Sequence, residues 1–184
     1  MRMKSASLWI AALGLMVQTG LAEEIRMIGN SVMYSSKSIL SNVMDSRTHK
    51  TLIKAMRSVK LEQPLMRRGS FTLFAPDDAA FAALPADYSD RVFRRINRDE
   101  MAHVLACHIV AGNDLAGRKL SDLVPDGGTL KLVTLGGCKL TLSRKAGKLF
   151  VIGPNGEEAE ITAVDVLQSN GMVQIINRVI LPSS

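Results

Sequence analysis

The sequence predicts an α+β domain with a mainly antiparallel sheet, and two observations lead to this fold class. Before Ile109, apolar residues recur at the three- and four-residue spacing of amphipathic helices. After Ile109, short runs of apolar, often β-branched residues are separated by glycine pairs at 127–128 and 136–137 and by a turn at 153–156. Helices followed by strands, without regular alternation, are typical of α+β domains rather than of parallel α/β folds.

The first two predicted helices lie between residues 39 and 59. One face of the first helix comprises Ile39, Leu40, Val43 and Met44. In the second helix Thr48 can supply the N-cap, because its hydroxyl can accept a hydrogen bond from a backbone N–H of the first turn. The apolar face of this second helix comprises Leu52, Ile53, Met56 and Val59.

A strand and further helices follow. Residues 71–75 form a β-prone run. Asp77 or Asp78 can then cap a short helix. Asn97 with Glu100 three residues later resembles a capping box, which predicts the start of another helix. The apolar residues of that helix are Met101, Val104 and Leu105.

Five strands are predicted in the second half of the chain. Each is a short apolar or alternating run that is bounded by turn-forming residues. Their ranges are 130–133, 139–142, 149–152, 161–164 and 172–181. An Asn-Gly pair at 170–171 predicts a tight turn before the last strand, because both residue types tolerate positive φ.

The first 22 residues are typical of a signal peptide. Arg2 and Lys4 form a short positive region, an apolar stretch covers residues 8–17, and small residues precede a cleavage position after Ala22. The apolar stretch is shorter than the roughly 20 residues that a transmembrane helix needs. A buried N-terminal helix is the alternative interpretation of this segment.

Export of the protein sets the expected organisation and location. We expect an N-terminal arm at residues 23–36 and one domain at residues 37–184, in the periplasm or outside the cell. No later segment of the sequence predicts a membrane span, and export argues against nucleic acid as a partner. The hydrophobic content of 47% suffices for a core. The formal net charge of +6 becomes +4 when residues 1–22, with Arg2 and Lys4, are removed, and this mild basicity favours an anionic partner surface.

The sequence contains two cysteines, Cys107 and Cys138. In an oxidising compartment they could form a disulfide that closes a loop of about 30 residues. Two buried thiols that pack as small apolar side chains are the alternative. The sequence leaves both open, because a disulfide depends on the Cα separation of the two residues.

Motifs of the common enzyme classes are absent from the sequence. It contains no nucleophile elbow, no zinc-protease helix motif, no paired Cys-x-x-Cys and no phosphate-binding glycine loop. The spacing of His49, His103 and His108 does not indicate a metal pair. Cys107 beside His108 could suggest a thiolate–imidazole pair, but adjacent side chains usually point apart. We therefore expect no enzymatic activity, no metal and no cofactor.

Three segments together resemble the signatures of the fasciclin (FAS1) domain family. They are residues 71–81, 105–112 and 170–182, and they occur in the order that the family has. The resemblance implies the FAS1 fold, with two β-sheets packed as a wedge and several helices on one side. It also implies a secreted or surface-attached protein without enzymatic activity, which mediates cell adhesion, matrix contact or host association by binding a protein or a glycan.

The resemblance further implies which residues take part in partner binding. His108 and Ile109 belong to the central segment, and Asn170 and Gly171 open the closing segment. The family usually has a tyrosine before this histidine, and Cys107 stands in its place. The chain therefore lacks a phenol that could contribute buried area and a hydrogen bond at this position.

A carrier of an apolar small molecule, such as a carotenoid or a lipid, is the alternative function. Some FAS1 relatives bind such compounds between apolar surface helices. Ile39, Leu40, Val43 and Met44 would supply the ligand surface here, because methionine adapts to irregular apolar shapes. Packing in the core is the alternative role of these four side chains.

Overall fold

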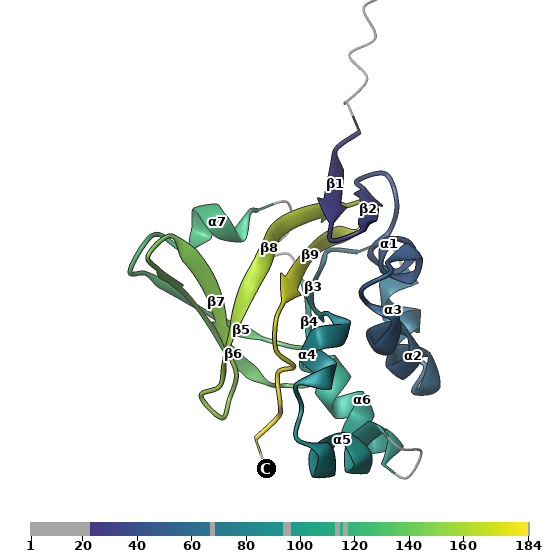
Figure 1. Cartoon of the computed structure of the whole chain (residues 1–184). Coiled ribbons are helices and arrows are strands. Elements are labelled where there is room, and N and C mark those ends of the chain that lie inside the picture. Colours follow the sequence, from purple (N-terminus) through teal and green to yellow (C-terminus); the bar gives the residue numbers. More distant parts are fainter. Residues whose placement is uncertain (1–22, 67–68, 94–96, 113–114, 116–117, 184) are drawn as a thin grey trace, which may run out of the picture.

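The computed structural model describes residues 23–66, 69–93, 97–112, 115 and 118–183 (Figure 1). The expected signal peptide at residues 1–22 lies outside the described residues. Among the helices that the structure describes, none combines the length and the hydropathy that a bilayer span requires.

The segment that we expected to be an arm is a β-hairpin. β1 (Ile25–Ile28) pairs antiparallel with β2 (Ser31–Tyr34), and the hairpin contributes Ile28 and Met33 to the core. The buried residues of β2 alternate with half-buried ones, but strands of four residues are too short for this period to stand out in the sequence. The hairpin is therefore packed on the domain.

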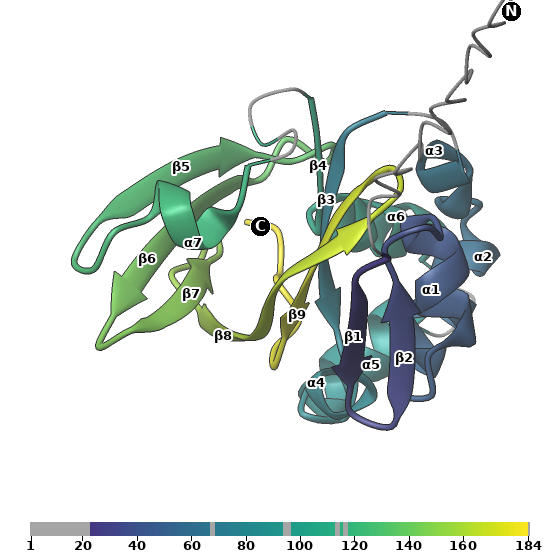
Figure 2. The same ribbon diagram turned by 90° about the horizontal axis from the view of Figure 1, so that it is seen from above.

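Seven helices are seen in the described part of the chain. They are α1 (Ile39–Asp45), α2 (Lys50–Ser58), α3 (Glu62–Met66), α4 (Asp78–Ala82), α5 (Ala86–Phe93), α6 (Arg98–Ala106) and α7 (Leu120–Leu123). Figures 1 and 2 show α1 to α6 on one side of the strands β3 and β9, and α7 on the other side. The concentration of helices in the first half of the chain is confirmed.

The helix caps agree only in part with the sequence. The carboxylate of Asp77 accepts a hydrogen bond from the backbone N–H of Ala80, which confirms it as the N-cap of α4. The N-cap of α2 is His49 rather than Thr48, and its side chain forms no capping hydrogen bond. Asp78 instead accepts hydrogen bonds from the first two backbone N–H groups of α2, because α4 packs beside it.

The capping box expected at the start of α6 does not form. Asn97 is the N-cap residue, but its side chain makes no capping hydrogen bond. Its amide Nδ2 donates to Oε2 of Glu100 instead, over 3.1 Å. The helix still begins at the predicted place, and Asp99 and Glu100 supply negative charge to its first turn.

Seven strands form one hydrogen-bonded sheet. They are β3 (Phe71–Pro76), β4 (Ile109–Ala111), β5 (Thr129–Val133), β6 (Lys139–Lys145), β7 (Lys148–Ile152), β8 (Glu158–Gln168) and β9 (Gly171–Ile176). The spatial order is β4-β3-β9-β8-β7-β6-β5. Every pairing is antiparallel except that of β3 with β9, which is parallel. The predicted α+β class with a mainly antiparallel sheet is confirmed.

The wedge arises because β8 belongs to both halves of this sheet. Register shifts in β8 between Ile161 and Ala163 and between Ala163 and Val166 interrupt its pairing with β9. Such bulges bend a strand and increase its twist. Figure 2 shows β8 running from the β5–β7 half towards β9. The two sheets are therefore two halves of one bent sheet.

The bend divides the interior into two apolar cores. Leu73 of β3 and Val173 of β9 face the core beneath the helices. Phe74 and Ile176, the alternate residues, face the core between the two halves of the sheet, where Leu140 is fully buried. Residues on successive strand positions point to opposite faces, so β3 and β9 serve both cores at once.

The last strand is shorter than the sequence predicts. It ends at Ile176 rather than at residue 181, because the chain then leaves the sheet. Asn177 still exchanges hydrogen bonds with the backbone of Glu160. Val179 and Ile180 are buried, one in each core, so this stretch remains apolar without being a strand.

Candidate functional site

His108 lies in the interior, immediately before β4. Its imidazole is fully buried, with Nδ1 2.7 Å from the carbonyl oxygen of Val104. The backbone N–H of Ile180 donates a hydrogen bond to Nε2 over 2.9 Å. A ring whose Nε2 accepts from an N–H group and whose Nδ1 faces a carbonyl oxygen is neutral and carries its proton on Nδ1. Burial lowers the pKa of His108 to about 4.

Asn170 joins two helices to the end of β8. Its Oδ1 accepts a hydrogen bond from the backbone N–H of Ile39, and its Nδ2 donates to the carbonyl of Leu65, over 2.9 and 2.8 Å. Both bonds are buried, and Asn170 itself is 8% exposed. The side chain therefore holds the start of α1 and the end of α3 against the sheet.

Gly171 is required by the close approach of β3. A Cβ at this position would overlap the carbonyl oxygen of Phe71, its partner in the parallel pairing. Its φ is +146°, in the region that favours glycine. The tight turn predicted before the last strand is present at residues 169–170, and Gly171, rather than Asn170, has the positive φ.

The residues expected to bind a partner therefore face inward. His108 and Ile109 have no exposed surface, and Asn170 has almost none. Their side chains are occupied by helix and strand contacts, so a partner could reach them only after these contacts were broken, and their role in partner binding stays a prediction. The motif residues hold the fold together, which is why polar side chains recur in an otherwise apolar segment.

The four residues expected to form an apolar ligand surface also pack inward for the most part. Ile39, Leu40 and Val43 belong to the core beneath the helices. Only Met44 is exposed, at 44% of its surface. Core packing, the alternative role that the sequence left open, is thus the main role of this helical face.

A depression of about 300 Å³ lies on the surface between α1 and α2. Val43, Met44 and Ile53 line it with apolar atoms, and the side chains of α2 add cations. Lys50, Lys54 and Arg57 are spaced by four and three residues, so they share one helix face. All three are exposed. Within the part of the chain that the structure describes, none of them forms an ion pair.

His49 lines the same depression but adds no positive charge at neutral pH. Burial lowers its pKa, against the opposing influence of Asp77 and Asp78. Its Nδ1 lies 2.7 Å from the hydroxyl of Ser46, and Nε2 has no hydrogen-bond partner among the described residues. The cationic character of this α2 face, defined by Lys50, Lys54 and Arg57, therefore comes from the three side chains alone.

The basic α2 face was missed in the sequence. The i, i+4, i+7 spacing of Lys50, Lys54 and Arg57 is visible there, opposite the apolar face of the same helix. A lysine- and arginine-bearing helix face is usually only a solvated surface, so spacing alone does not mark a site. The structure adds the neighbouring apolar depression and shows that these three cations form no ion pair with the residues it describes.

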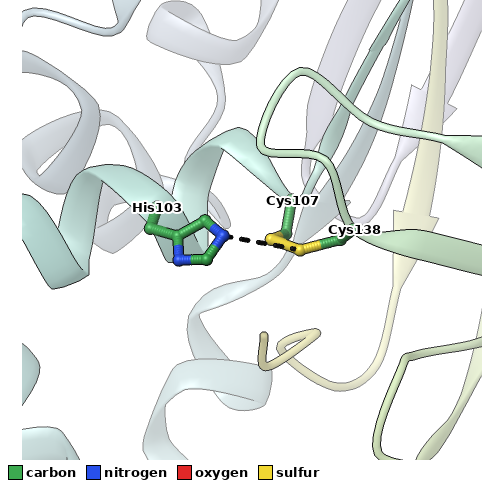
Figure 3. Close-up of side chains that lie close together, drawn as sticks. All are labelled: His103, Cys107 and Cys138. Carbon is green, nitrogen blue, oxygen red and sulfur yellow. Dashed lines mark hydrogen bonds between the residues drawn. A yellow bond between two sulfur atoms is a disulfide. The ribbon is translucent and has the colours of Figure 1, made fainter. Parts of the chain in front are cut away.

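Cys107 and Cys138 form a disulfide with a Cα–Cα distance of 5.3 Å. It joins the C-terminus of α6 to the loop between β5 and β6. His103 lies beside it (Figure 3), with Nε2 4.0 Å from Sγ of Cys138 and 3.1 Å from the carbonyl oxygen of Gly136. A depression of about 370 Å³, lined by His103 and Cys138 among others, opens next to the disulfide.

Asp165 is the centre of a buried polar network on the bent part of β8. Its carboxylate accepts hydrogen bonds from the backbone N–H groups of Leu120 and Ser121 and from the Ser121 hydroxyl. Nε2 of Gln174 donates a further bond, and Oε1 of Gln174 accepts one from the Asp165 backbone. These partners hold α7 on the sheet and occupy both oxygens of the carboxylate.

Comparison with known proteins gave several matches. The model of the fasciclin domain matches residues 47–182. Protein sll1483 of Synechocystis sp. is 30% identical over 167 residues, which cover 91% of this chain and 86% of that protein. Transforming growth factor-beta-induced protein ig-h3 of Sus scrofa is 30% identical over 131 residues, 71% of this chain but only 17% of that protein.

Two further matches extend the range of relatives. Immunogenic protein MPB70 of Mycobacterium bovis is 28% identical over 117 residues, 64% of this chain and 52% of that protein. Among solved structures, a FAS1 domain pair from the insect cell adhesion molecule Fasciclin I aligns with a TM-score of 0.66 at 14% identity. That alignment covers 86% of this chain and 66% of the other, and it establishes the likeness of fold.

Proposed function

Because the chain belongs to the fasciclin domain family, we propose that it is an exported binding module that attaches to a cell or matrix surface. Fasciclin domains are adhesion domains without enzymatic activity, and the related structure comes from an insect cell adhesion molecule. The partner in this proposal is a protein or a glycan of acidic character. The single observation that carries the choice of an acidic partner is the basic α2 face.

The basic α2 face has the properties of a surface for an anion. Lys50, Lys54 and Arg57 are exposed on one side of α2 and are not neutralised by ion pairs within the described residues. Charges so arranged raise the local concentration of an anionic partner and speed its encounter. The apolar depression beside them supplies area for van der Waals contact. An acidic polysaccharide or an acidic protein segment fits this combination.

The hydrogen bonds inside the domain also favour a function on the outer surface. The polar residues of the family segments, His108 and Asn170, are used in internal hydrogen bonds. These residues could take part in catalysis or partner binding only after their internal hydrogen bonds were broken. We therefore place the function on the outer surface of α2, and we propose that the chain is not an enzyme.

Binding to an immobilised acidic glycan tests the proposal. Heparin is the probe, and a neutral dextran surface is the reference. We expect saturable binding of the purified protein that weakens as salt is added, because exposed charges are screened within about 10 Å at 0.1 M salt. The triple variant Lys50→Gln/Lys54→Gln/Arg57→Gln should bind roughly 3- to 150-fold more weakly, if each cation contributes about 0.2 to 1 kcal/mol.

A matched control variant distinguishes binding at the basic α2 face from binding that depends only on the net charge of the protein. Lys119→Gln/Lys131→Gln/Lys139→Gln removes the same number of positive charges from exposed positions outside α2. This variant should retain most of the affinity. Equal losses in the two triple variants would show that net charge alone drives binding, and absence of saturable binding to any acidic surface would contradict the proposal.

Transport of an apolar small molecule is the second candidate, and one observation favours it. Val43, Met44 and Ile53 line the depression of about 300 Å³ between α1 and α2. This apolar surface is smaller than the one expected from the sequence, since Ile39 and Leu40 are buried. Incubation with a carotenoid, followed by gel filtration, should leave pigment on the wild-type protein but not on Met44→Asp. Colourless wild-type protein would exclude this candidate.

A further inference from the structure

We propose that reduction of the Cys107–Cys138 disulfide opens a binding site for Zn²⁺ formed by two thiolates and Nε2 of His103. The structure brings one ligand atom from each of these three residues within 4.8 Å of the others. Figure 3 shows the imidazole directed at the two sulfur atoms. Cysteine sulfur and histidine nitrogen are the ligands that zinc prefers in proteins.

The spacing of the three groups suits a tetrahedral ion. Zn–S bonds of about 2.3 Å and Zn–N bonds of about 2.0–2.1 Å place the ligand atoms roughly 3.5–3.8 Å apart. Nε2 of His103 already lies 4.0 Å from Sγ of Cys138. His103 and Cys107 are four residues apart on α6, so both side chains point to one side of the helix. Small side-chain rotations after the S–S bond breaks are therefore sufficient.

The scaffold does not depend on the disulfide to keep these residues together. The backbone N–H of Gly136 donates to the carbonyl of Ala106 over 3.0 Å, and that of Leu135 donates to Ile109 over 2.7 Å. These bonds hold the β5–β6 loop on the end of α6. Within the loop, the N–H of Cys138 donates to the Thr134 hydroxyl over 3.0 Å. The two cysteines consequently stay side by side after reduction.

The close packing of this loop on α6 also depends on Gly136. A Cβ at Gly136 would lie 3.0 Å from the backbone nitrogen of Cys107 and 3.1 Å from its sulfur. A Cβ at this distance would require the loop or α6 to shift by a few tenths of an ångström. The carbonyl of Gly136 also orients the ring of His103, because it lies 3.1 Å from Nε2. Zinc would replace this hydrogen bond.

Solvent reaches the site from one side. The depression of about 370 Å³ is lined by His103, Gly137 and Cys138, and His103 is exposed. Cys107 is fully buried, so a reductant or an ion meets Cys138 and His103 first. The depression also leaves room for a water molecule as the fourth ligand, which three protein ligands require.

A dithiol reductant can supply the electrons and protons that reduction of the disulfide consumes. The reductant donates two electrons and two protons, the S–S bond breaks to give two thiols, and the reductant becomes a disulfide. Zn²⁺ then displaces one proton from each thiol to solvent and takes Nε2 of the neutral His103 ring as its third ligand, while the ring proton resides on Nδ1. Reformation of the disulfide by an oxidised dithiol releases the ion.

Metal titration of the full chain in both redox states tests the proposal. The protein is reduced with a phosphine under nitrogen, the phosphine is removed, and Co²⁺ is added as a spectroscopic probe before Zn²⁺ displaces it. We expect one Co²⁺ per chain with thiolate-to-cobalt charge transfer and the visible bands of a tetrahedral complex. The oxidised protein should give neither signal.

Variants identify the ligands. Cys138→Ser should abolish the charge-transfer band or shift it strongly. His103→Gln should raise the Kd for Zn²⁺ at least about tenfold, because loss even of a residue that supports a metal ligand costs 10–100-fold in affinity. His103 is exposed, so its replacement keeps the fold, which circular dichroism verifies. Asp122→Asn, an exposed carboxylate on α7, is the matched control and should bind as the wild type does.

Two results would overturn the proposal. One is the absence of saturable cobalt or zinc binding to the reduced, folded protein. The other is binding that His103→Gln leaves unchanged, which would assign the ion to the cysteines alone or to another site. Neither result depends on whether the basic α2 face binds an acidic partner, because glycan binding is measured with the oxidised protein.

Discussion

The buried imidazole of His108 accepts a hydrogen bond from the backbone N–H of Ile180, 72 residues further along the chain. The same ring faces the carbonyl of Val104 in α6. One side chain thus joins the end of a helix to the segment that follows the last strand. Only the neutral ring can do so, since the protonated ring has no acceptor at Nε2.

The stability of the protein should therefore fall in acid through His108. Its pKa is about 4 in the folded chain against an ordinary value of 6.5, so the unfolded chain binds more protons between these pH values. Stability is complete above pH 6.5 and is lost as the pH falls towards 4, by up to about 3 kcal/mol. Urea unfolding of the wild type and of His108→Gln from pH 7 to pH 4 measures this loss.

His108→Gln is itself less stable at neutral pH, but its pH dependence should be shallower. The variant retains His49 and all carboxylates, whose titration also affects acid stability. The difference between the two pH profiles consequently isolates His108. Parallel profiles would show that the imidazole binds protons equally in the folded and the unfolded chain, which would mean that burial does not lower its pKa.

Gly171→Ala should lower the free energy of unfolding by at least about 3 kcal/mol, or prevent folding. The new Cβ would overlap the Phe71 carbonyl in the parallel pairing of β3 with β9. Gly147→Ala is the control, because this glycine also has positive φ but no atom within 4 Å of an added Cβ. The control should lose only about 1–2 kcal/mol. Thermal and urea unfolding compare the two variants, and similar losses would contradict the steric explanation.

Asn170→Ala should cost about 2–4 kcal/mol, because it leaves the buried N–H of Ile39 and the carbonyl of Leu65 without their partner. Asn155→Ala removes an exposed asparagine that bonds to the carbonyls of Leu181 and Pro182, and it should cost less than about 1 kcal/mol. Equilibrium unfolding in urea gives both values. A loss below that of the control would place Asn170 outside the structural core.

Removal of the disulfide should lower stability by about 3–4 kcal/mol without unfolding the chain. The bond spans 31 residues, and the backbone bonds from Gly136 and Leu135 hold the same loop. The double variant Cys107→Ala/Cys138→Ala should keep the circular dichroism of the wild type and unfold at lower urea concentration. An unfolded double variant at neutral pH would mean that the disulfide, and not the backbone contacts, maintains the loop.

Asp165→Ala should lower stability by about 2–4 kcal/mol, since four hydrogen-bond donors lose their acceptor and an alanine must adopt a φ of +56°. Asp126→Ala, which removes an exposed carboxylate in the turn before β5, should change stability by less than about 1 kcal/mol. Hydrogen exchange of the Leu120 and Ser121 amides provides a local measure, and unchanged protection of these amides would contradict the network.

Much of the fold could be predicted because its elements follow simple periods. The strands β5 to β8 lie where apolar runs meet glycine turns, and α6 begins where Asn97 indicated. The hairpin at 25–34 could not be predicted, since each strand is too short to reveal its alternation. The end of β9 was missed because the chain becomes apolar again at residues 179–181, where Val179 and Ile180 fill the two cores after the chain has left the sheet.

The candidate site was harder to predict than the fold. Polar residues inside a motif suggested a binding surface. In the structure, His108 and Asn170 form hydrogen bonds with the backbone of segments that are distant in the sequence. Hydrogen-bond partners that lie so far apart in the chain cannot be identified from a single sequence. The proximity of His103 to Cys107 and Cys138 depends on the path of the β5–β6 loop, which only the structure provides.

The position of β9 has a consequence for how the chain folds during synthesis. The last strand to be made lies between β3 and β8, so the sheet has a gap at its centre until residue 176 has left the ribosome. Long-range pairings of this kind form slowly, because a large loop must close first. The seven-stranded sheet can therefore be completed only near the end of synthesis, after its six other strands have been made.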